Sequence, residues 1–199
     1  MTVQHADLAV FVDRATVRYD RRYPHPIDLV FEAVSTSEHL DVWMLPVSRV
    51  ERRPGGRCSF TWGGPEGEGE GGAQVGVVAD FEPPRLITYA FDDPPSWFRF
   101  ELEPVDGAGG KPGTLLHFTL HWPIPAGQLN EADDYPGGDL PAGPGTAWRP
   151  GFLSGFHEML GDLEGFLSGT WTAADRAAHL AAFPQPGYLA LVDAYREHV

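Results

Sequence analysis

The sequence predicts an α+β fold in which a curved antiparallel sheet wraps around one long helix. From residue 47 to residue 122, short segments alternate apolar and polar residues and are separated by turn-forming residues, a pattern typical of consecutive antiparallel strands. Residues 150–168 then carry apolar side chains at every third or fourth position, which forms one broad apolar stripe on a helix. The inner face of the preceding strands is the surface in this chain that is large enough to cover the stripe.

The N-terminal part predicts one strand and two short helices. Residues 15–23 alternate in polarity, and Pro24 and Pro26 end the strand that this pattern predicts. Apolar residues at helical spacing and a Ser-Thr pair that can cap a helix then predict helices over 27–34 and 36–43.

The middle of the chain predicts a meander of strands with short turns. We expect these strands over residues 47–52, 57–62, 73–82, 85–91, 97–103 and 114–122. Alternation within the third of them predicts one shared face for Val75, Val77, Ala79 and Phe81. The Gly- and Glu-rich residues 63–72 and the Pro-, Gly- and Asp-rich residues 123–148 predict two loops.

The C-terminal end predicts a helical extension. Residues 172–183 and 188–199 both have helical patterns, and the second is amphipathic enough to need a surface to dock on. We therefore expect a sheet-and-helix domain over residues 13–169 and a helical extension over residues 170–199.

Composition excludes several kinds of partner. The net charge of −14 repels phosphate backbones and anionic membranes, so we expect neither nucleic acid nor membrane as a partner. No apolar run approaches the ~20 residues of a membrane span, and the single cysteine, Cys58, cannot form an internal disulfide. These features predict a cytoplasmic protein.

Several stretches resemble a known family. They are Pro24 to Trp43, the turn Arg53 to Arg57, Gly76 to Tyr89, Gly113 to Thr119 and Gly155 to Gly169. The chain resembles the SRPBCC superfamily (START-like, Bet v 1-like) and, within it, the family named after the activator of the heat-shock-protein-90 ATPase. The resemblance implies the helix-grip fold, and in this superfamily the space between sheet and helix commonly holds a small apolar or aromatic molecule. Many bacterial relatives have Gly-Trp-His where this chain has Gly155-Phe156-His157.

Inward-facing aromatic residues form the candidate ligand site. Strand parity places large rings on the inner face of the sheet, opposite the rings of the long helix, and apolar walls with few polar groups are typical of small-molecule pockets. The candidate ligand-binding residues are Trp43, Phe60, Trp62, Tyr89, Phe91, Phe98, Phe100, Phe118, Phe152, Phe156 and His157, with Trp122 at the end of the last strand. A dry aromatic core is the alternative interpretation.

Few polar residues are placed for chemistry. His117 and His121 lie four strand residues, or about 13 Å, apart, too far to share a metal ion. His157 begins a segment that resembles the zinc-protease helix motif, but Gly161 stands where the second histidine is required. We therefore expect no metal and no cofactor. Arg21 has inward parity and needs water, a carboxylate or an anionic ligand as its partner.

These observations predict a binding protein for a small apolar or aromatic molecule, with no catalytic residue assigned. A cyclase, hydrolase or lyase that uses the same cavity is the first alternative, and it would need a polar set formed by Tyr89, His157 and Arg21. The second alternative is an interaction module, either co-chaperone-like or a homodimer formed through the last helix.

Overall fold

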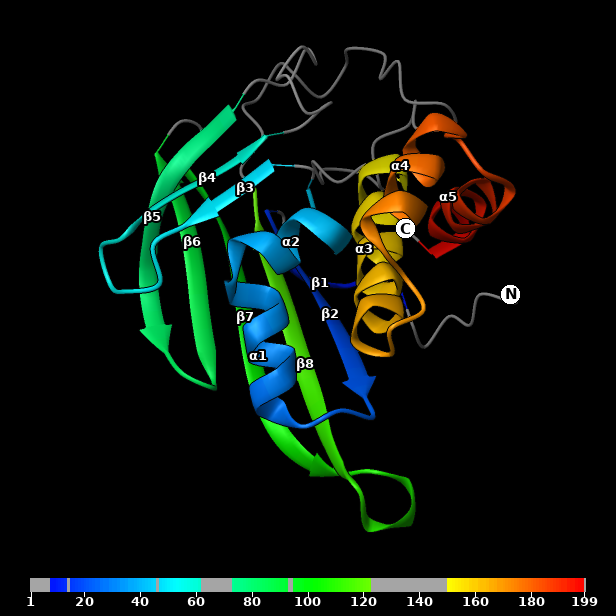
Figure 1. Cartoon of the computed structure of the whole chain (residues 1–199). Helices are drawn as coiled ribbons and strands as arrows, with labels where there is room; N and C mark the ends of the chain where they lie inside the picture. The colour runs from blue at the N-terminus through cyan, green and yellow to red at the C-terminus, as the bar shows by residue number, and fades with distance from the viewer. Residues whose placement is uncertain are drawn as a thin grey trace.

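The computed structural model describes residues 8–13, 15–45, 47–61, 73–92, 95–122 and 150–198. Within these residues, eight strands form one antiparallel sheet in the order β1-β2-β8-β7-β6-β5-β4-β3. The strands are β1 (Val10–Asp13), β2 (Thr16–Tyr23), β3 (Val47–Val50), β4 (Arg57–Thr61), β5 (Ala73–Glu82), β6 (Leu86–Asp92), β7 (Pro95–Asp106) and β8 (Pro112–His121). Figure 1 shows the sheet curving around the helices.

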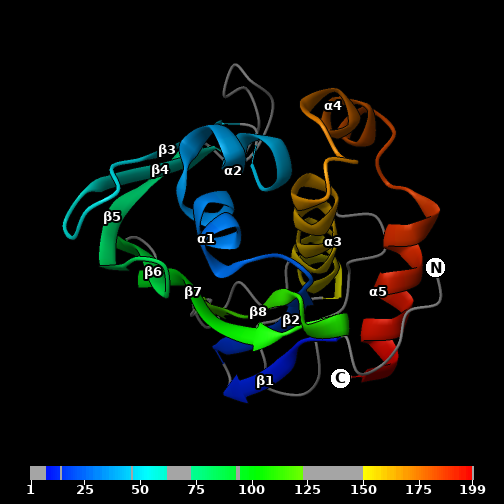
Figure 2. The ribbon, with the colours of Figure 1, turned by 60° about the horizontal axis from the view of Figure 1, so that its bottom comes forward.

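Five α-helices accompany the sheet in the described part of the chain. They are α1 (Ile27–Ser35), α2 (Ser37–Trp43), α3 (Pro150–Leu167), α4 (Ala173–Ala181) and α5 (Pro186–His198), and a short 3₁₀ helix, η2 (Ala108–Gly110), connects β7 to β8. Figure 2 shows α3 between the pair α1 and α2 on one side and α5 on the other, with the sheet beneath.

The long helix packs on the sheet as its pattern predicts. Leu153, Phe156, Leu160 and Leu163 are at most 2% exposed, and they recur at the helical spacing that places them on one face. The antiparallel register also aligns aromatic residues across neighbouring strands. Tyr19 of β2 lies opposite Phe118 of β8, and Phe118 lies opposite Phe100 of β7. The predicted α+β helix-grip fold is confirmed.

The strand β1 has no counterpart in the sequence prediction. It has four residues, and its Val10 and Val12 are more than half exposed, so neither its length nor its polarity distinguishes it from a loop. Its position at the edge of the sheet, paired with β2 alone, depends on tertiary contacts.

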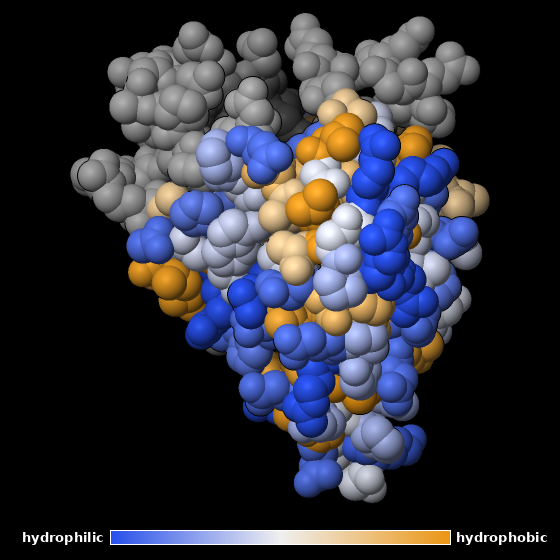
Figure 3. Space-filling view, turned by 90° about the vertical axis from the view of Figure 1, so that its left-hand side faces the viewer, coloured by the Kyte–Doolittle hydropathy of each residue, from blue (hydrophilic) through white to orange (hydrophobic). Residues whose placement is uncertain are grey.

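The expected face of β5 is wrong in part. Val75 and Val77 are 56% and 45% exposed, whereas Val78 is buried. The register shifts between Val78 and Asp80, and this irregularity switches the alternation between the two faces. Gly76 pairs with the buried residues Cys58 and Phe91, and it must be glycine because a Cβ atom there would lie 2.1 Å from the Ala90 carbonyl oxygen and 2.7 Å from a ring carbon of Phe91. Figure 3 views the side of the molecule on the left of Figure 1, where hydrophobic residues form separate patches among hydrophilic ones.

The two helices of the extension dock on α3 and α2. A capping box starts α4: the Thr172 hydroxyl accepts the Asp175 N–H, and the Asp175 carboxylate accepts the Thr172 N–H at 2.9 Å. The apolar side of α5 is buried through Tyr188, Val192 and Tyr195, and the Tyr188 hydroxyl donates to the Gly151 carbonyl of α3 at 3.1 Å.

Candidate functional site

The predicted site residues form one aromatic cluster between the sheet and α3. Most of them are no more than 4% exposed: Trp43, Phe60, Tyr89, Phe91, Phe98, Phe100, Phe118 and Phe156. Phe152 and His157 are half-buried, and Trp62 lies outside the described residues. The structure therefore brings the described members together, while their contact with a ligand stays a prediction.

The rings in the interior pack directly on one another. Phe100 and Phe118 stack with centroids 4.5 Å apart, and the Phe60 and Tyr89 rings meet edge to face at 5.0 Å. Phe156 of α3 closes the layer, 5.8 Å from Phe98. These distances are those of favourable aromatic pairs, so this part of the cluster acts as packed core and as a rigid wall.

Polar atoms of the interior rings are used within the protein. The Tyr89 hydroxyl donates to the Val34 carbonyl at 2.8 Å, and Trp43 Nε1 donates to the Ala33 carbonyl at 2.9 Å. Both acceptors belong to α1, so these bonds fasten the helix to the aromatic layer. Burial raises the pKa of Tyr89 well above its ordinary value, so its hydroxyl stays protonated and acts as a donor.

The aromatic cluster reaches the surface at one end. Trp122 follows β8 and Phe152 lies in the first turn of α3, and both are half-buried. Their centroids are 5.8 Å apart, Trp122 stacks on Phe98 at 6.3 Å, and Phe152 contacts Phe156 at 4.9 Å. A continuous aromatic surface thus runs from the buried interior to this exposed end.

His157 lies at the edge of the cluster and contacts the extension. Its Nδ1 lies 3.2 Å from the Tyr195 hydroxyl of α5, which also accepts the N–H of Ala9 at 3.0 Å. Burial lowers the pKa of His157 to about 3, and the charge of Arg21 lowers it further. The imidazole is therefore neutral near pH 7. Sequence reasoning placed His157 at this margin but did not find Tyr195, because their contact depends on the docking of α5.

Only part of the polar set required by the enzyme alternative comes together. Arg21 and His157 both lie beside the Tyr19 ring: the Arg21 guanidinium carbon is 5.7 Å from its centroid, and the centroid of the His157 ring is 6.4 Å from it. The Tyr89 hydroxyl is bonded to α1 instead. The geometry therefore offers a pair of polar groups where the enzyme hypothesis needs three.

A buried ionic cluster between α3 and α4 is not evident from the sequence. Arg176 of α4 donates to the carbonyls of Trp43 and Met44 and lies 3.4 Å from the Asp162 carboxylate. One turn away, His179 Nε2 lies 3.5 Å from Glu158.

Burial changes the titration of this ionic cluster. It raises the pKa of Glu158 to about 7, where Asp162 adds repulsion and Arg176 opposes the rise. It also raises the pKa of Asp162 to about 6 and lowers that of His179. Spacing of four residues on α3 could have indicated that the two carboxylates share a face, but nothing in the sequence indicates that Arg176 meets them.

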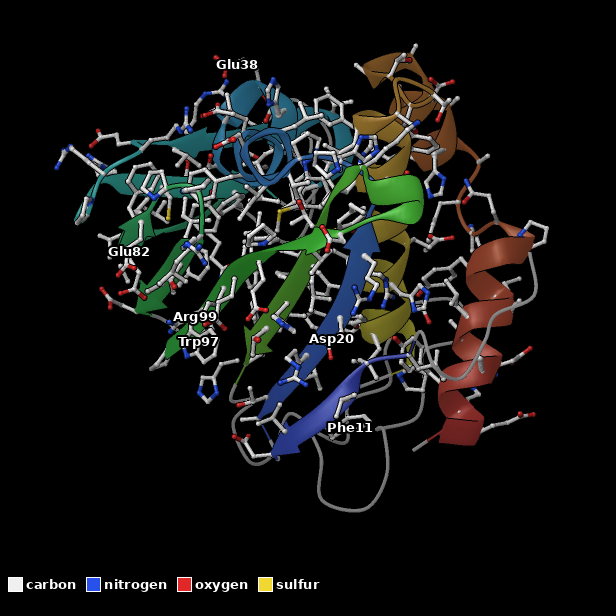
Figure 4. The ribbon with its side chains drawn as sticks, turned by 90° about the horizontal axis from the view of Figure 1, so that it is seen from below. Phe11, Asp20, Glu38, Glu82, Trp97 and Arg99 are labelled. Atoms are coloured by element: carbon white, nitrogen blue, oxygen red, sulfur yellow. The ribbon has the colours of Figure 1, made fainter. Side chains whose placement is uncertain are left out.

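The histidines on the outer face of the sheet are bound separately. His117 Nδ1 lies 2.6 Å from the Asp20 carboxylate, and His121 Nδ1 lies 2.9 Å from the Thr16 hydroxyl while its ring stacks on Trp97 at 5.4 Å. Figure 4 shows Trp97 on β7 and Asp20 on β2 from below. Across the described ranges, no three His, Cys, Asp or Glu side chains are arranged to hold a metal ion.

A groove of about 470 Å³ opens at the far end of the sheet, where the β7–β8 hairpin meets the start of α1. Its lining consists of Pro26, Ile27, Asp28, Pro104, Val105, Asp106, Gly110, Pro112 and Gly113. It shares no residue with the aromatic cluster.

Among the described helices, none is long and apolar enough to cross a membrane.

Solved structures with low sequence identity share this fold. Protein NE0264 from Nitrosomonas europaea is 18% identical with a TM-score of 0.57, and the alignment covers 80% of this chain and 97% of that one. A conserved protein of unknown function from Enterococcus faecalis, EF2215, is 13% identical with a TM-score of 0.56, over 96% and 89%. CalU16 from Micromonospora echinospora is 18% identical with a TM-score of 0.54, over 92% and 84%.

Sequence comparison assigns the family. No curated protein matches the chain. The sequence profile described as "Activator of Hsp90 ATPase homolog 1-like protein" matches residues 24–133, which is more than half of the 199 residues. The match includes α1, α2 and strands β3 to β8, which carry the aromatic cluster except for its residues on α3. The chain therefore belongs to the family of activator of Hsp90 ATPase homolog 1-like proteins.

Proposed function

We propose that this protein binds a small apolar or aromatic molecule at the exposed end of its aromatic cluster. The observation that carries the proposal is the half-buried pair Trp122 and Phe152, which continues the buried rings of Phe98 and Phe156 toward the surface. Large rings that stay partly exposed next to a packed aromatic layer are the surface on which a flat apolar ligand gains the most contact area.

The interior residues of the cluster would hold this site in place without contacting the ligand themselves. Trp43 and Tyr89 are fixed to the backbone of α1, and Phe100 and Phe118 are stacked on each other. A rigid layer of this kind keeps Trp122 and Phe152 in place, so the protein loses little conformational entropy when a ligand binds.

The polarity of the described cluster favours an uncharged ligand. The polar side-chain atoms of its interior rings, on Trp43 and Tyr89, are already bonded within the protein. A charged group inserted among Phe98, Phe152 and Phe156 would lose its hydration without gaining a hydrogen bond. Flat apolar compounds such as indole and naphthalene are therefore suitable probes.

Calorimetric titration of the full chain with indole and with naphthalene tests the proposal. Trp122→Ala and Phe152→Ala are expected to weaken binding by about fivefold or more each, because a stacking partner worth about 1 kcal/mol is lost. Trp97→Ala is the matched control, since Trp97 is a half-buried tryptophan on the opposite face of the sheet. No binding to the wild-type chain, or equal losses in Trp122→Ala and Trp97→Ala, would refute the proposal.

A further inference from the structure

The start of α3 carries one ring of the proposed apolar site, and it is a weak stretch of helix. Phe152 is the third residue of α3, and Gly151 and Gly155 lie on either side of it. Glycine is one of the least favourable residues in a helix, and the first N–H groups of any helix have no acceptor within it. The position of Phe152 therefore depends on contacts from outside α3.

The last helix, α5, docks along this weak stretch at two points. The Tyr188 hydroxyl donates to the Gly151 carbonyl at 3.1 Å, and the Tyr195 hydroxyl lies 3.2 Å from His157 Nδ1. Each pair of residues is separated by about 10 Å along its own helix, so the two spacings match. Both tyrosines are fully buried, and Figure 2 shows α5 beside α3. The extension thus supports the first two turns of α3.

The two rings of the proposed site belong to different parts of the fold. Trp122 follows the sheet, where its N–H donates to the Ala15 carbonyl at 2.8 Å, whereas Phe152 belongs to α3, with its ring centroid 5.8 Å from that of Trp122. On the sheet side, the Tyr19 hydroxyl holds the same helical turn through the Leu153 carbonyl at 2.9 Å. Any shift of this turn relative to the sheet changes the separation of the rings, and the bond from Tyr188 opposes such a shift from the α5 side.

We propose that the docked extension sets the affinity of the apolar site, with Tyr188 as a positioning residue that holds Phe152 against Trp122. This inference rests on the apolar site proposed above. Coupling between two equilibria is reciprocal, so a bound ligand also stabilises the docked state of α5. Release of α5 weakens ligand binding for the same reason.

Calorimetric titration of the full chain with indole compares two tyrosine variants. Tyr188→Phe removes the bond to Gly151 and keeps the ring, and we expect it to weaken binding about fivefold, the effect of one hydrogen bond. Tyr23→Phe is the matched control, because the Tyr23 hydroxyl also donates to a carbonyl of α3, that of Leu160, at 3.0 Å. Leu160 lies about 12 Å along the helix from Phe152, so this variant is expected to bind indole as the wild type does.

Two glycine variants separate positioning from general stability of the helix. A Cβ atom built on Gly155 or on Gly161 meets nothing within 4 Å, so alanine fits at either position and strengthens α3 there. Gly155→Ala strengthens the stretch that Tyr188 holds, and we expect it to restore most of the binding lost in Tyr188→Phe. Gly161→Ala acts further along α3 and is expected to restore none of it.

Hydrogen exchange measures the coupling from the side of the extension. Saturating indole is expected to slow exchange in Pro186–His198 about fivefold in the wild type, by the reciprocity of the coupling, and to have no such effect in Tyr188→Phe. No binding of indole by the wild type would refute the apolar site itself. Wild-type binding with equal affinities in Tyr188→Phe and Tyr23→Phe, indole-independent exchange in α5, or equal restoration by Gly155→Ala and Gly161→Ala would refute the coupling and leave the site standing.

Discussion

The two sides of α3 are held by different physical forces. Toward the sheet, the helix presents Phe156, Leu160 and Leu163, all nearly fully buried among apolar neighbours. Toward α4 it presents Glu158 and Asp162, which meet Arg176 and His179. The first side is stabilised by apolar burial, which is insensitive to pH, whereas the second contains buried ionisable groups whose protonation changes near neutrality. The α3 helix therefore joins a core whose stability does not depend on pH to a helical extension whose packing does.

The largest expected effect is loss of a ring from the apolar side. Phe118 is 2% exposed and packs on Phe100 and Phe156, so Phe118→Ala removes apolar burial and leaves a cavity. We expect a loss of about 3–5 kcal/mol in the free energy of unfolding, measured by urea denaturation. Val75→Ala on the exposed face of β5 is the control, with a loss below about 0.5 kcal/mol. A loss as small as the control's would contradict the assignment of Phe118 to a packed core.

The next effect is a pH dependence that belongs to the charged side. Burial raises the Glu158 pKa from 4.5 to about 7, so between these values the folded state binds more protons than the unfolded state. The contribution of Glu158 to the free energy of unfolding is therefore fully present below about pH 4.5 and is lost as the pH rises through 7. The loss is on the order of 3 kcal/mol.

Glu158→Gln is expected to abolish this contribution. Comparing urea denaturation of this variant with the wild type from pH 4.5 to 8 isolates it from the opposite effect of His157, whose pKa is lowered to about 3. For His157, stability is lost as the pH falls below its ordinary value of 6.5. Exposed Glu197→Gln is the control. Parallel curves for Glu158→Gln and the wild type would show that Glu158 is not buried as described.

The smallest of the three effects is detachment of α4. Arg176→Met removes the donor shared by the Trp43 and Met44 carbonyls and the partner of Asp162. We expect a cost of about 1–3 kcal/mol for the groups left without a donor, concentrated in α4, where Arg176 is the buried residue. Hydrogen exchange should therefore accelerate in Ala173–Ala181 and stay slow in β7 and β8.

The exposed pair of the extension provides the comparison for Arg176. Arg196→Met breaks a contact at 3.1 Å with Asp193, which is 71% exposed, so its expected cost is below about 1 kcal/mol. Adding Asp162→Asn to Arg176→Met should recover part of the lost stability, since the buried carboxylate no longer lacks its cation. Uniform acceleration of exchange across α3, α4 and β8 would show instead that the ionic cluster supports the whole fold.

Much of the architecture follows from local sequence patterns. Alternation of residues 97–103 and 114–122 predicts β7 and β8, and the stripe from Phe152 to Phe166 predicts α3, because side-chain periodicity is a property of each segment alone. The same reasoning gives the two helices of the extension. It fails in β5, where an irregularity after Val78 reverses the faces, and at β1, whose four residues carry too short a pattern.

The sequence by itself determined the family, the α+β class and the inward set of rings, because these depend on the order and spacing of apolar residues. Tertiary structure alone decided which polar groups meet. Arg176 bonds to the carbonyl of Trp43 in α2, 133 residues away in the chain, and Tyr195 meets His157 because α5 docks on α3. Hydrogen bonds and ion pairs act over a few ångströms and leave no periodic pattern in the sequence. They form only when the fold places their atoms side by side.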